Sequence, residues 1–338
     1  TGKEHDYAEK LEKIAGDRDE ARKNWQTIGT IKELKDGYIS QVVRKIVDLA
    51  IENNAFIVLE NLNVGFKKGR QKIEKQVYQK MELALAKKLN YLIDKTAKEG
   101  ENVSVAKAVQ LTPPVNNFGD IEARSQFGIM LYTKADYTSQ TDPVTGWRKT
   151  IYLKKGSEDY IKDQILNSFD DFGFDGKDYY FTYINKNTNN KWTLYSGKNG
   201  KSLDRYYRQL VYENSDKKWI PQKEDLVERL DKIFENFNLD TNQSIKNQIL
   251  DGDDIKLIKY REKDQNAWES LRFTIDLIQQ IRNSGVEKKD EDFILSPIRD
   301  KNNKHFDSRK VVDDDLPTSG DANGAYNIAR KGIITNEH

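Results

Sequence analysis

The sequence contains no cysteine and only three histidines, His5, His305 and His338. The absence of cysteine excludes disulfides, thiolate zinc sites and thiol nucleophiles, and it fits a reducing compartment. Two of the histidines lie near a terminus, so neither a histidine-based triad nor a histidine-rich metal site is expected. No apolar run approaches the length of a membrane span, and the first residues lack the apolar core of a signal peptide.

An excess of one charge is also missing, since 56 basic residues stand against 55 acidic ones among 338. Any surface that binds nucleic acid must therefore be local. The length allows two domains. The chain starts without Met and enters a charged stretch at once, which we interpret as a piece of a longer protein.

The first part of the chain predicts two helices, a strand and a third helix. Residues 6–25 are highly charged with a thin apolar stripe, which is typical of a helix that bridges domains. Residues 37–54 carry apolar side chains at three- and four-residue steps and predict an amphipathic helix. The apolar run 56–59 predicts a strand buried on both faces. A basic loop then leads into a helix that is expected to end near residue 95.

From about residue 136 the pattern changes to short segments with alternating aromatic residues. Residues 179–183 and 192–195 are joined by an Asn-rich turn and predict a β-hairpin. Helices are expected over 266–282 and over 321–331, the second closed by Gly332. The pattern indicates an α/β domain that is interrupted by an inserted α+β domain, with the tail returning to the first.

Two acids stand where chemistry could occur. Glu60 follows the buried strand, at the end where open α/β sheets place their ligands; the alternative is an acid that faces solvent or caps a helix. Asp321 opens the last helix, and the alternative there is a helix N-cap. Together they could supply oxygen ligands for magnesium, as two-metal phosphodiester hydrolysis requires. The separation of 321 − 60 = 261 positions does not establish that they pair.

A basic segment follows Glu60. Its charge is 8 − 2 = +6, in a chain of net charge +1. Such a run is either a solvated helix face or a surface that tracks phosphates. The residues counted are Lys67, Lys68, Arg70, Lys72, Lys75, Lys80, Lys87 and Lys88 against Glu74 and Glu82.

Several short motifs, in a fixed order, resemble those of the type V-A CRISPR effector nucleases, the Cas-twelve-a or Cpf-one family. The resemblance covers nearly the whole chain. Its motifs are Gly29–Lys35, Gly37–Val43, Ile57–Asn63, Gly65–Lys67, Glu74–Lys80, Tyr137–Ser139, Asp142–Pro143, Thr145–Gly146, Ile281–Ser284, Ser296–Pro297, Phe306–Arg309 and Asp321–Tyr326.

The resemblance implies an α/β fold with an RNase H-like (RuvC) mixed sheet and flanking helices, incomplete at its N-terminal side. An α+β Nuc domain is inserted into it. The implied domains are a bridge helix (1–26), the RuvC domain with the second catalytic segment and the lid (27–135), the inserted Nuc domain (136–314) and the RuvC domain with the third catalytic segment (315–338).

The implied activity is RNA-guided DNA cleavage in antiviral defence, with magnesium, or manganese in its place, as the cofactor. The implied partners are a CRISPR guide RNA, the target DNA and the rest of the effector chain upstream of Thr1. The implied location is the cytoplasm of bacteria or archaea.

The resemblance also assigns roles to single residues. Glu60 and Asp321 correspond to catalytic acids and metal ligands, and Arg282 to a catalytic arginine. Asp292 lies near a second polar position that would contact nucleic acid. The alternatives are that Arg282 complements a helix dipole and that Asp292 caps a turn.

Other positions are implied to bind or to support the fold. Lys67, Lys68, Arg70 and Lys72 are expected to bind nucleic acid, within a lid of about Gly65 to Gln79. Trp25 corresponds to a structural anchor of the bridge helix. Phe306–Arg309 is interpreted as scaffold, with Asp307 and Arg309 paired.

The chain departs from the family in one respect that bears on activity. The first catalytic Asp of the family would lie upstream of Thr1, and no residue near His5 replaces it, so the isolated chain is expected to be inactive. One alternative is a non-catalytic fragment that binds nucleic acid or a partner protein. The other is a different two-carboxylate hydrolase such as a glycosidase.

Overall fold

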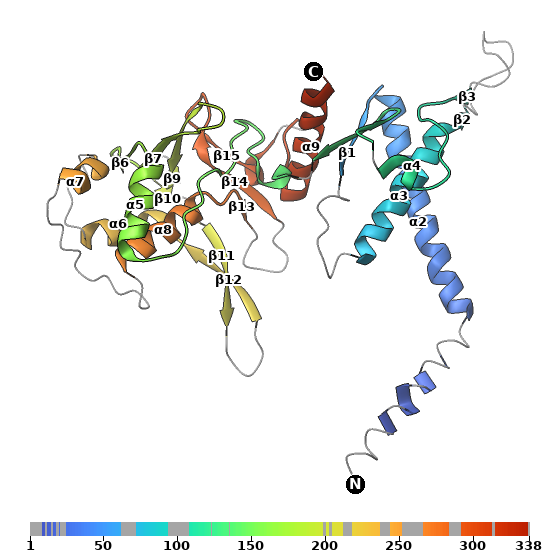
Figure 1. Ribbon diagram of the computed structural model, residues 1–338, viewed down its shortest axis with the longest axis horizontal. Coiled ribbons are helices and arrows are strands. Elements are labelled where there is room, and N and C mark those ends of the chain that lie inside the picture. Colours follow the sequence, from blue (N-terminus) through green and yellow to red (C-terminus); the bar gives the residue numbers. More distant parts are fainter. Residues whose placement is uncertain are drawn as a thin grey trace. The chain divides into compact units, whose positions relative to one another are not determined.

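The structure is a computed structural model, and it shows a mixed α/β protein with several small sheets (Figure 1). The chain divides into two compact units, Thr1–Ala135 with Thr335–His338 (unit 1) and Asp136–Ile334 (unit 2). Among the described residues, no helix is both long enough and apolar enough to cross a membrane. The described residues are 9–10, 12–14, 16–17, 20, 25–61, 72–93, 108–122, 124–134, 136–198, 201–202, 205–211, 218–236, 244–251, 266–283, 292–312 and 315–336.

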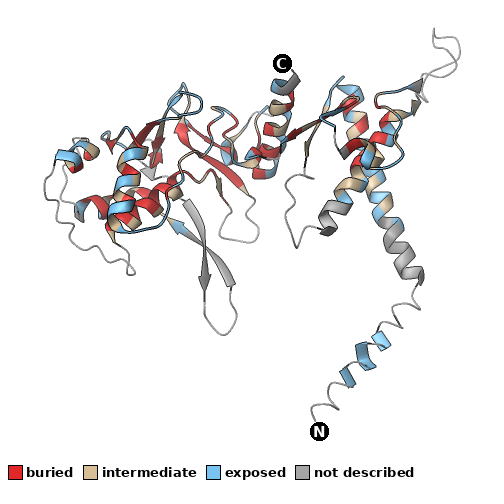
Figure 2. Ribbon diagram, in the orientation of Figure 1, coloured by how far each residue is buried: buried red, intermediate tan, exposed pale blue. Residues whose placement is uncertain are grey.

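Unit 1 is built on two helices, α2 (Trp25–Glu52) and α3 (Lys72–Asn90), that contact each other. Apolar residues at four-residue steps give each helix one buried face. That face joins residues of the following strands in a single core, so burial holds the helices against the sheet (Figure 2). The buried residues of this core are Val43, Val47, Leu85, Ala86, Leu89, Ile121, Phe127 and Met130.

The sheet of unit 1 is mixed. Strand β1 (Ile57–Asn61) pairs in parallel with β5 (Met130–Lys134), which pairs antiparallel with β4 (Gln126–Phe127). Because β1 and β5 are parallel, their carboxyl ends lie at the same edge of the sheet, and Glu60 is opposite Thr133. The remaining elements of unit 1 are α4 (Gly119–Glu122) and the pair β2 (Leu92–Ile93) and β3 (Ala108–Val109).

Three expectations for unit 1 need correction. Helix α2 begins at Trp25, because an exposed glycine at position 37 costs a helix only about 1 kcal/mol and does not end it. Helix α3 ends at Asn90, because Leu92 and Ile93 pair with β3. Strand β1 is confirmed, but its residues are partly rather than fully buried. The expected helix over 6–25 is different: the residues of this range that the structure describes (9–10, 12–14, 16–17, 20 and 25) are all helical, as predicted.

Among the glycines of unit 1 that the structure describes, Gly128 is the one whose replacement is expected to be most damaging. It has φ +63°, and a Cβ there would lie 2.0 Å from the Leu111 carbonyl oxygen and 2.6 Å from the Thr112 Cα, both backbone atoms. Gly128→Ala is therefore expected to lower the free energy of unfolding by about 3 kcal/mol or more, from backbone strain and overpacking together. Urea unfolding of the variant protein measures this.

Two other glycines provide the controls. Gly146 also has a positive φ (+74°), but no atom lies within 4 Å of a Cβ added there. Gly146→Ala therefore measures backbone strain without a clash, and it is expected to lower the free energy of unfolding by about 1 kcal/mol. Gly37→Ala lies in α2 with open space around it, and is expected to stabilise by about 1 kcal/mol. Equal effects of the Gly128 and Gly146 variants would contradict the predicted clash.

The described residues of unit 2 form two antiparallel three-stranded sheets. One consists of β6 (Asp171–Phe174), β7 (Tyr179–Ile184) and β8 (Lys191–Tyr195), which confirms the predicted hairpin. The other consists of β13 (Arg282–Asn283), β14 (Phe293–Arg299) and β15 (His305–Asp307). Shorter ladders pair β9 (Gly197–Lys198) with β10 (Lys201–Ser202), and β11 (Arg205–Val211) with β12 (Lys218–Glu224).

Helices of unit 2 share a large apolar core with the β6–β7–β8 sheet, which appears as the red interior of this unit in Figure 2. Trp147 and Trp268 are 1% and 2% exposed there, and the Trp147 indole donates to the Tyr183 hydroxyl. Rings of Phe169, Phe172 and Phe181 meet edge to face or stacked. The helices that contribute to this core are α5 (Glu158–Ser168), α6 (Leu226–Asn236), α7 (Ile245–Asp251) and α8 (Ala267–Ile278). Unit 2 also includes most of α9 (Gly320–Asn336).

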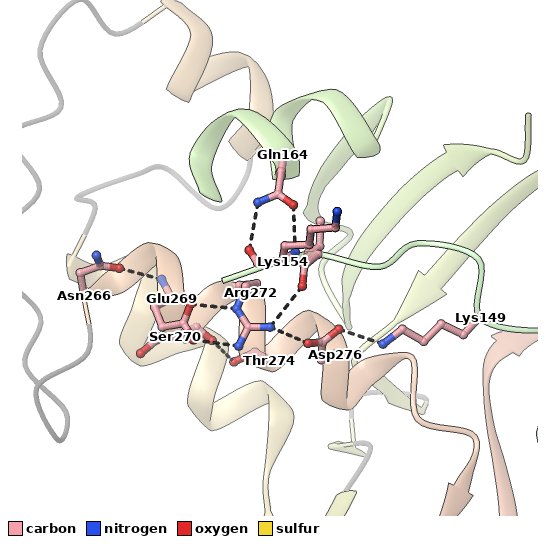
Figure 3. Close-up of polar contacts among 10 residues, drawn as sticks. Lys149, Lys154, Gln164, Asn266, Glu269, Ser270, Arg272, Thr274 and Asp276 are labelled. Carbon is pink, nitrogen blue, oxygen red and sulfur yellow. Dashed lines mark hydrogen bonds and ion pairs between the residues drawn. The ribbon is translucent and has the colours of Figure 1, made fainter. Parts of the chain in front are cut away.

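A polar network ties α8 to the segment that precedes α5 (Figure 3). The Arg272 guanidinium, 5% exposed as a residue, donates to both carboxylate oxygens of Glu269 at 2.8 Å and to Asp276 at 2.7 Å. Asp276 also accepts from Lys149 at 2.9 Å. A buried cation is thereby compensated by two acids on its own helix.

Two predicted helix ends in unit 2 are displaced. Helix α8 starts as expected, with Asn266 as its N-cap, but it ends at Ile278. Helix α9 continues past Gly332 to Asn336, because an interior glycine weakens a helix without ending it. Contacts place most of α9 in unit 2; the assignment of residues 315–338 to the first domain stays a prediction.

Candidate active-site acids and their surroundings

Glu60 lies at the carboxyl end of β1, as the sequence predicted. Its neighbours on the parallel strand β5 are Thr133, directly opposite, and Lys134 at the strand end. Ligands of α/β sheets gather at this edge because loops replace the strands there and leave room. Glu60 is partly buried, and its backbone is fixed by the pairing of β1 with β5.

A tyrosine of α3 holds the backbone of Glu60. The Tyr78 hydroxyl donates to the Glu60 carbonyl oxygen at 3.2 Å. Burial raises the pKa of Tyr78, and the charges of Glu82 and Glu60 raise it further, so this hydroxyl keeps its proton and remains a donor. Burial and the charge of Glu82 also raise the pKa of Tyr132 on β5. Glu82 itself is only 1% exposed.

Asp321 lies in the first turn of α9, where its charge suits the positive end of the helix dipole. The role of N-cap is taken by Ser319, whose hydroxyl oxygen accepts from the Ala322 backbone N–H at 3.2 Å. The alternative reading of Asp321 as an N-cap is therefore wrong. Its side chain is 90% exposed, so the carboxylate is open to a ligand.

Arg282 joins Asp321 to Asp292. Its Nε donates to Asp292 Oδ2 at 2.7 Å, its Nη2 contacts the same oxygen, and Nη2 also donates to Asp321 Oδ1 at 2.8 Å. The backbone N–H of Gly320 donates to the Asp292 carbonyl at 3.0 Å. Three of the predicted site residues, all in unit 2, are therefore in direct contact.

The charge of Arg282 is secured by its two acids. Burial opposes the charge, but the hydrogen bonds and charges of Asp292 and then Asp321 outweigh it and raise the pKa of Arg282 above its ordinary value. Arg282 lies in strand β13, after α8 has ended, so it does not complement a helix dipole. Asp292 directs its carboxylate at Arg282. The arrangement keeps a fixed cation beside an exposed carboxylate.

The two predicted metal ligands fall in different units, Glu60 in unit 1 and Asp321 in unit 2. Their convergence stays a prediction. Within the described residues, no group of three or more His, Cys, Asp or Glu side chains forms a metal-binding cluster. The chemistry of the donors nevertheless fits a hard cation, because both candidates are carboxylates, neither residue is buried, and the Asp321 side chain is exposed.

Several predicted binding residues cannot be placed. Lys67, Lys68 and Arg70 lie outside the described residues, and Lys72 and Trp25 are described only as the first backbone positions of α3 and α2. Their roles, and that of the lid, stay predictions. The pairing of Asp307 with Arg309 is confirmed by two bonds of 2.9 Å, which outweigh burial and lower the pKa of Asp307.

Sequence reasoning missed four residues around the candidate acids. Glu82 was counted only as an opposing charge of the basic segment, yet it is buried. Tyr78 was quoted only within a motif. Asn323 and Asn327 of α9 are 0% and 4% exposed, although asparagine is usually a surface residue. Their spacing of four, starting two positions after Asp321, is the signal that could have revealed them.

The comparison with known protein families indicates a nuclease. The family described as the RuvC nuclease domain matches residues 2–338. Domains of this kind hydrolyse phosphodiester bonds of nucleic acid and generally depend on metal ions. The position of Glu60 at the carboxyl end of a strand in a mixed sheet is consistent with such a domain. Since the match spans nearly the whole chain, the protein belongs to the RuvC nuclease domain family.

Proposed function

We propose that this chain is the nuclease portion of a CRISPR RNA-guided DNA endonuclease that cuts the strands of its target DNA. The observation that carries the proposal is the position of Glu60 at the carboxyl end of β1, in a chain that matches the RuvC nuclease domain over residues 2–338. The ordered motifs that resemble the Cas-twelve-a family supply the RNA-guided part.

In this proposal Glu60 and Asp321 hold magnesium through their carboxylate oxygens. Magnesium, when bound, would activate water and neutralise the leaving oxygen during phosphodiester hydrolysis. The exposure of the Asp321 carboxylate, 90%, supports this role because nothing bulky covers it. Manganese, which accepts the same oxygen ligands, would substitute.

Arg282 has two tasks in the proposal. It holds Asp321 Oδ1 through Nη2, which fixes the direction of the carboxylate, and it provides a guanidinium that can contact a phosphate. Asp292 would then act on DNA through Arg282, because a carboxylate does not attract phosphate directly. Lys67, Lys68, Arg70 and Lys72 would follow the backbone of the strand.

The test uses the full-length protein with a guide RNA and a duplex labelled on each strand. We expect both strands to be cut only when the guide matches the target and magnesium is present. A scrambled guide and a chelator such as EDTA are the controls. Cutting that is equally fast with the scrambled guide would contradict RNA guidance, and cutting in EDTA would contradict the metal requirement.

A further inference from the structure

The face by which α9 contacts the rest of unit 2 is partly polar, which is unusual for a docked helix. Asn323 and Asn327 are buried one turn apart on this face. The Asn323 amide donates to the Thr141 carbonyl at 2.9 Å, and the Asn327 amide donates to the carbonyls of Thr138 and Thr141 at 3.1 Å. Both asparagines thus bind the backbone of the segment that follows Asp136.

The two asparagines are also bonded to each other. The Asn327 Nδ2 lies 3.1 Å from the Asn323 side-chain oxygen and 3.0 Å from its backbone oxygen, so its two N–H groups are shared between these oxygens and the carbonyls of Thr138 and Thr141. Two cationic side chains of α9 continue this row of donors, and the four residues together form a polar stripe. Arg330 donates to the Pro143 carbonyl at 2.7 Å, and Lys331 donates to the Asp136 carbonyl at 2.5 Å. Positions 323, 327, 330 and 331 follow helical spacing, so one face of α9 donates to the carbonyls of one segment.

This stripe begins in the turn that carries Asp321. The Asn323 backbone N–H donates to the Ser319 carbonyl at 2.9 Å, while its side chain is bonded to Thr141. The turn is therefore fixed by a cap on one side and a buried amide on the other. Because Asp321 is itself exposed, the backbone of this turn, together with Arg282, decides where its carboxylate points.

An apolar residue could fill the same space but could not replace these bonds. A leucine at 327 would remove the amide that donates to the Thr138 carbonyl, and a leucine at 323 would remove one of the two amides that donate to the Thr141 carbonyl. A buried group left unsatisfied costs about 1 to 3 kcal/mol. The helix would settle in a shifted position to recover these bonds, and Asp321 would move with it. Mutation of a residue that orients a metal ligand without touching the metal commonly lowers metal affinity by about 10- to 100-fold.

We infer that Asn323 and Asn327 are positioning residues, which hold the first turn of α9 so that the Asp321 carboxylate faces its cation. The inference rests on the proposed function of Asp321. It adds two residues to the site that touch neither substrate nor ion and act through the backbone of α9.

The test compares Asn323→Leu and Asn327→Leu with Asn190→Leu in the full-length protein. Asn190 is an exposed asparagine ahead of β8 and serves as the matched control. Three quantities are measured: thermal unfolding, Mn²⁺ affinity by calorimetry, and the Mg²⁺ concentration that gives half-maximal DNA cleavage. We expect Mn²⁺ to bind about 10- to 100-fold more weakly, and the Mg²⁺ requirement to rise correspondingly, in both variants but not in the control.

Asn327→Gln keeps the amide donor and is expected to restore part of the Mn²⁺ affinity; it also serves if the leucine variants do not fold. Lower thermal stability with unchanged Mn²⁺ affinity and Mg²⁺ requirement would overturn the inference, because the asparagines would then only stabilise the fold. Asp321→Ala is measured alongside. If it abolishes cleavage while the asparagine variants match the control, only the inference fails. If it changes neither binding nor cleavage, the proposed function itself fails.

Discussion

Glu60→Gln and Asp321→Asn are each expected to slow DNA cleavage by the full-length protein about 1,000-fold or more, with target binding unchanged. Each substitution keeps the size of the side chain and removes the charge that would hold a cation. Charge stabilisation by a bound metal contributes several kcal/mol to such a transition state, and about 4 kcal/mol corresponds to three orders of magnitude in rate. Single-turnover cleavage with saturating guide RNA measures the rate, and fluorescence anisotropy measures binding.

Matched controls come from exposed acids on helices of the same units. Glu52→Gln changes the last residue of α2, and Asp163→Asn changes an exposed position of α5. Both should cleave at the rate of the unchanged protein. If either Glu60→Gln or Asp321→Asn also does so, that residue is not a metal ligand. A loss of cleavage accompanied by an equal loss of target binding would likewise count against the assignment.

The features that could be predicted from the sequence all depend on residues close together in the chain. The strand before Glu60 is short, apolar and β-branched, and that pattern is sufficient to predict both the strand and the position of the acid at its end. Asp307 and Arg309 are two residues apart, so their pairing needs only local geometry. The β7–β8 hairpin follows from alternation and an Asn-rich turn.

The parts that sequence did not predict depend on contacts between distant positions. Glu82 is buried because α3 turns that face toward Tyr132, 50 positions away, and its charge alone suggests exposure. Asn323 is buried because its amide reaches the carbonyl of Thr141, 182 positions away. Arg282 contacts Asp292 and Asp321 across a chain reversal that no local pattern encodes.

Arg272→Met is expected to lower the stability of unit 2 strongly. Methionine fills the volume of the guanidinium stem but leaves Glu269 and Asp276 without their shared cation, and their side chains are only 15% and 27% exposed. Removing one partner of a buried ion pair lowers the free energy of unfolding by about 3 to 5 kcal/mol. Asp276 keeps Lys149, so most of the cost arises at Glu269.

Lys232→Met is the matched control, since Lys232 pairs with Glu228 on α6 with side chains 52% and 64% exposed. Exposed pairs one turn apart contribute only about 0.3 to 0.5 kcal/mol. Urea unfolding of the full-length protein, followed by the fluorescence of the buried Trp147 and Trp268, compares the two variants. If Arg272→Met costs no more than Lys232→Met, the network in Figure 3 does not hold α8, and the apolar core alone accounts for its position.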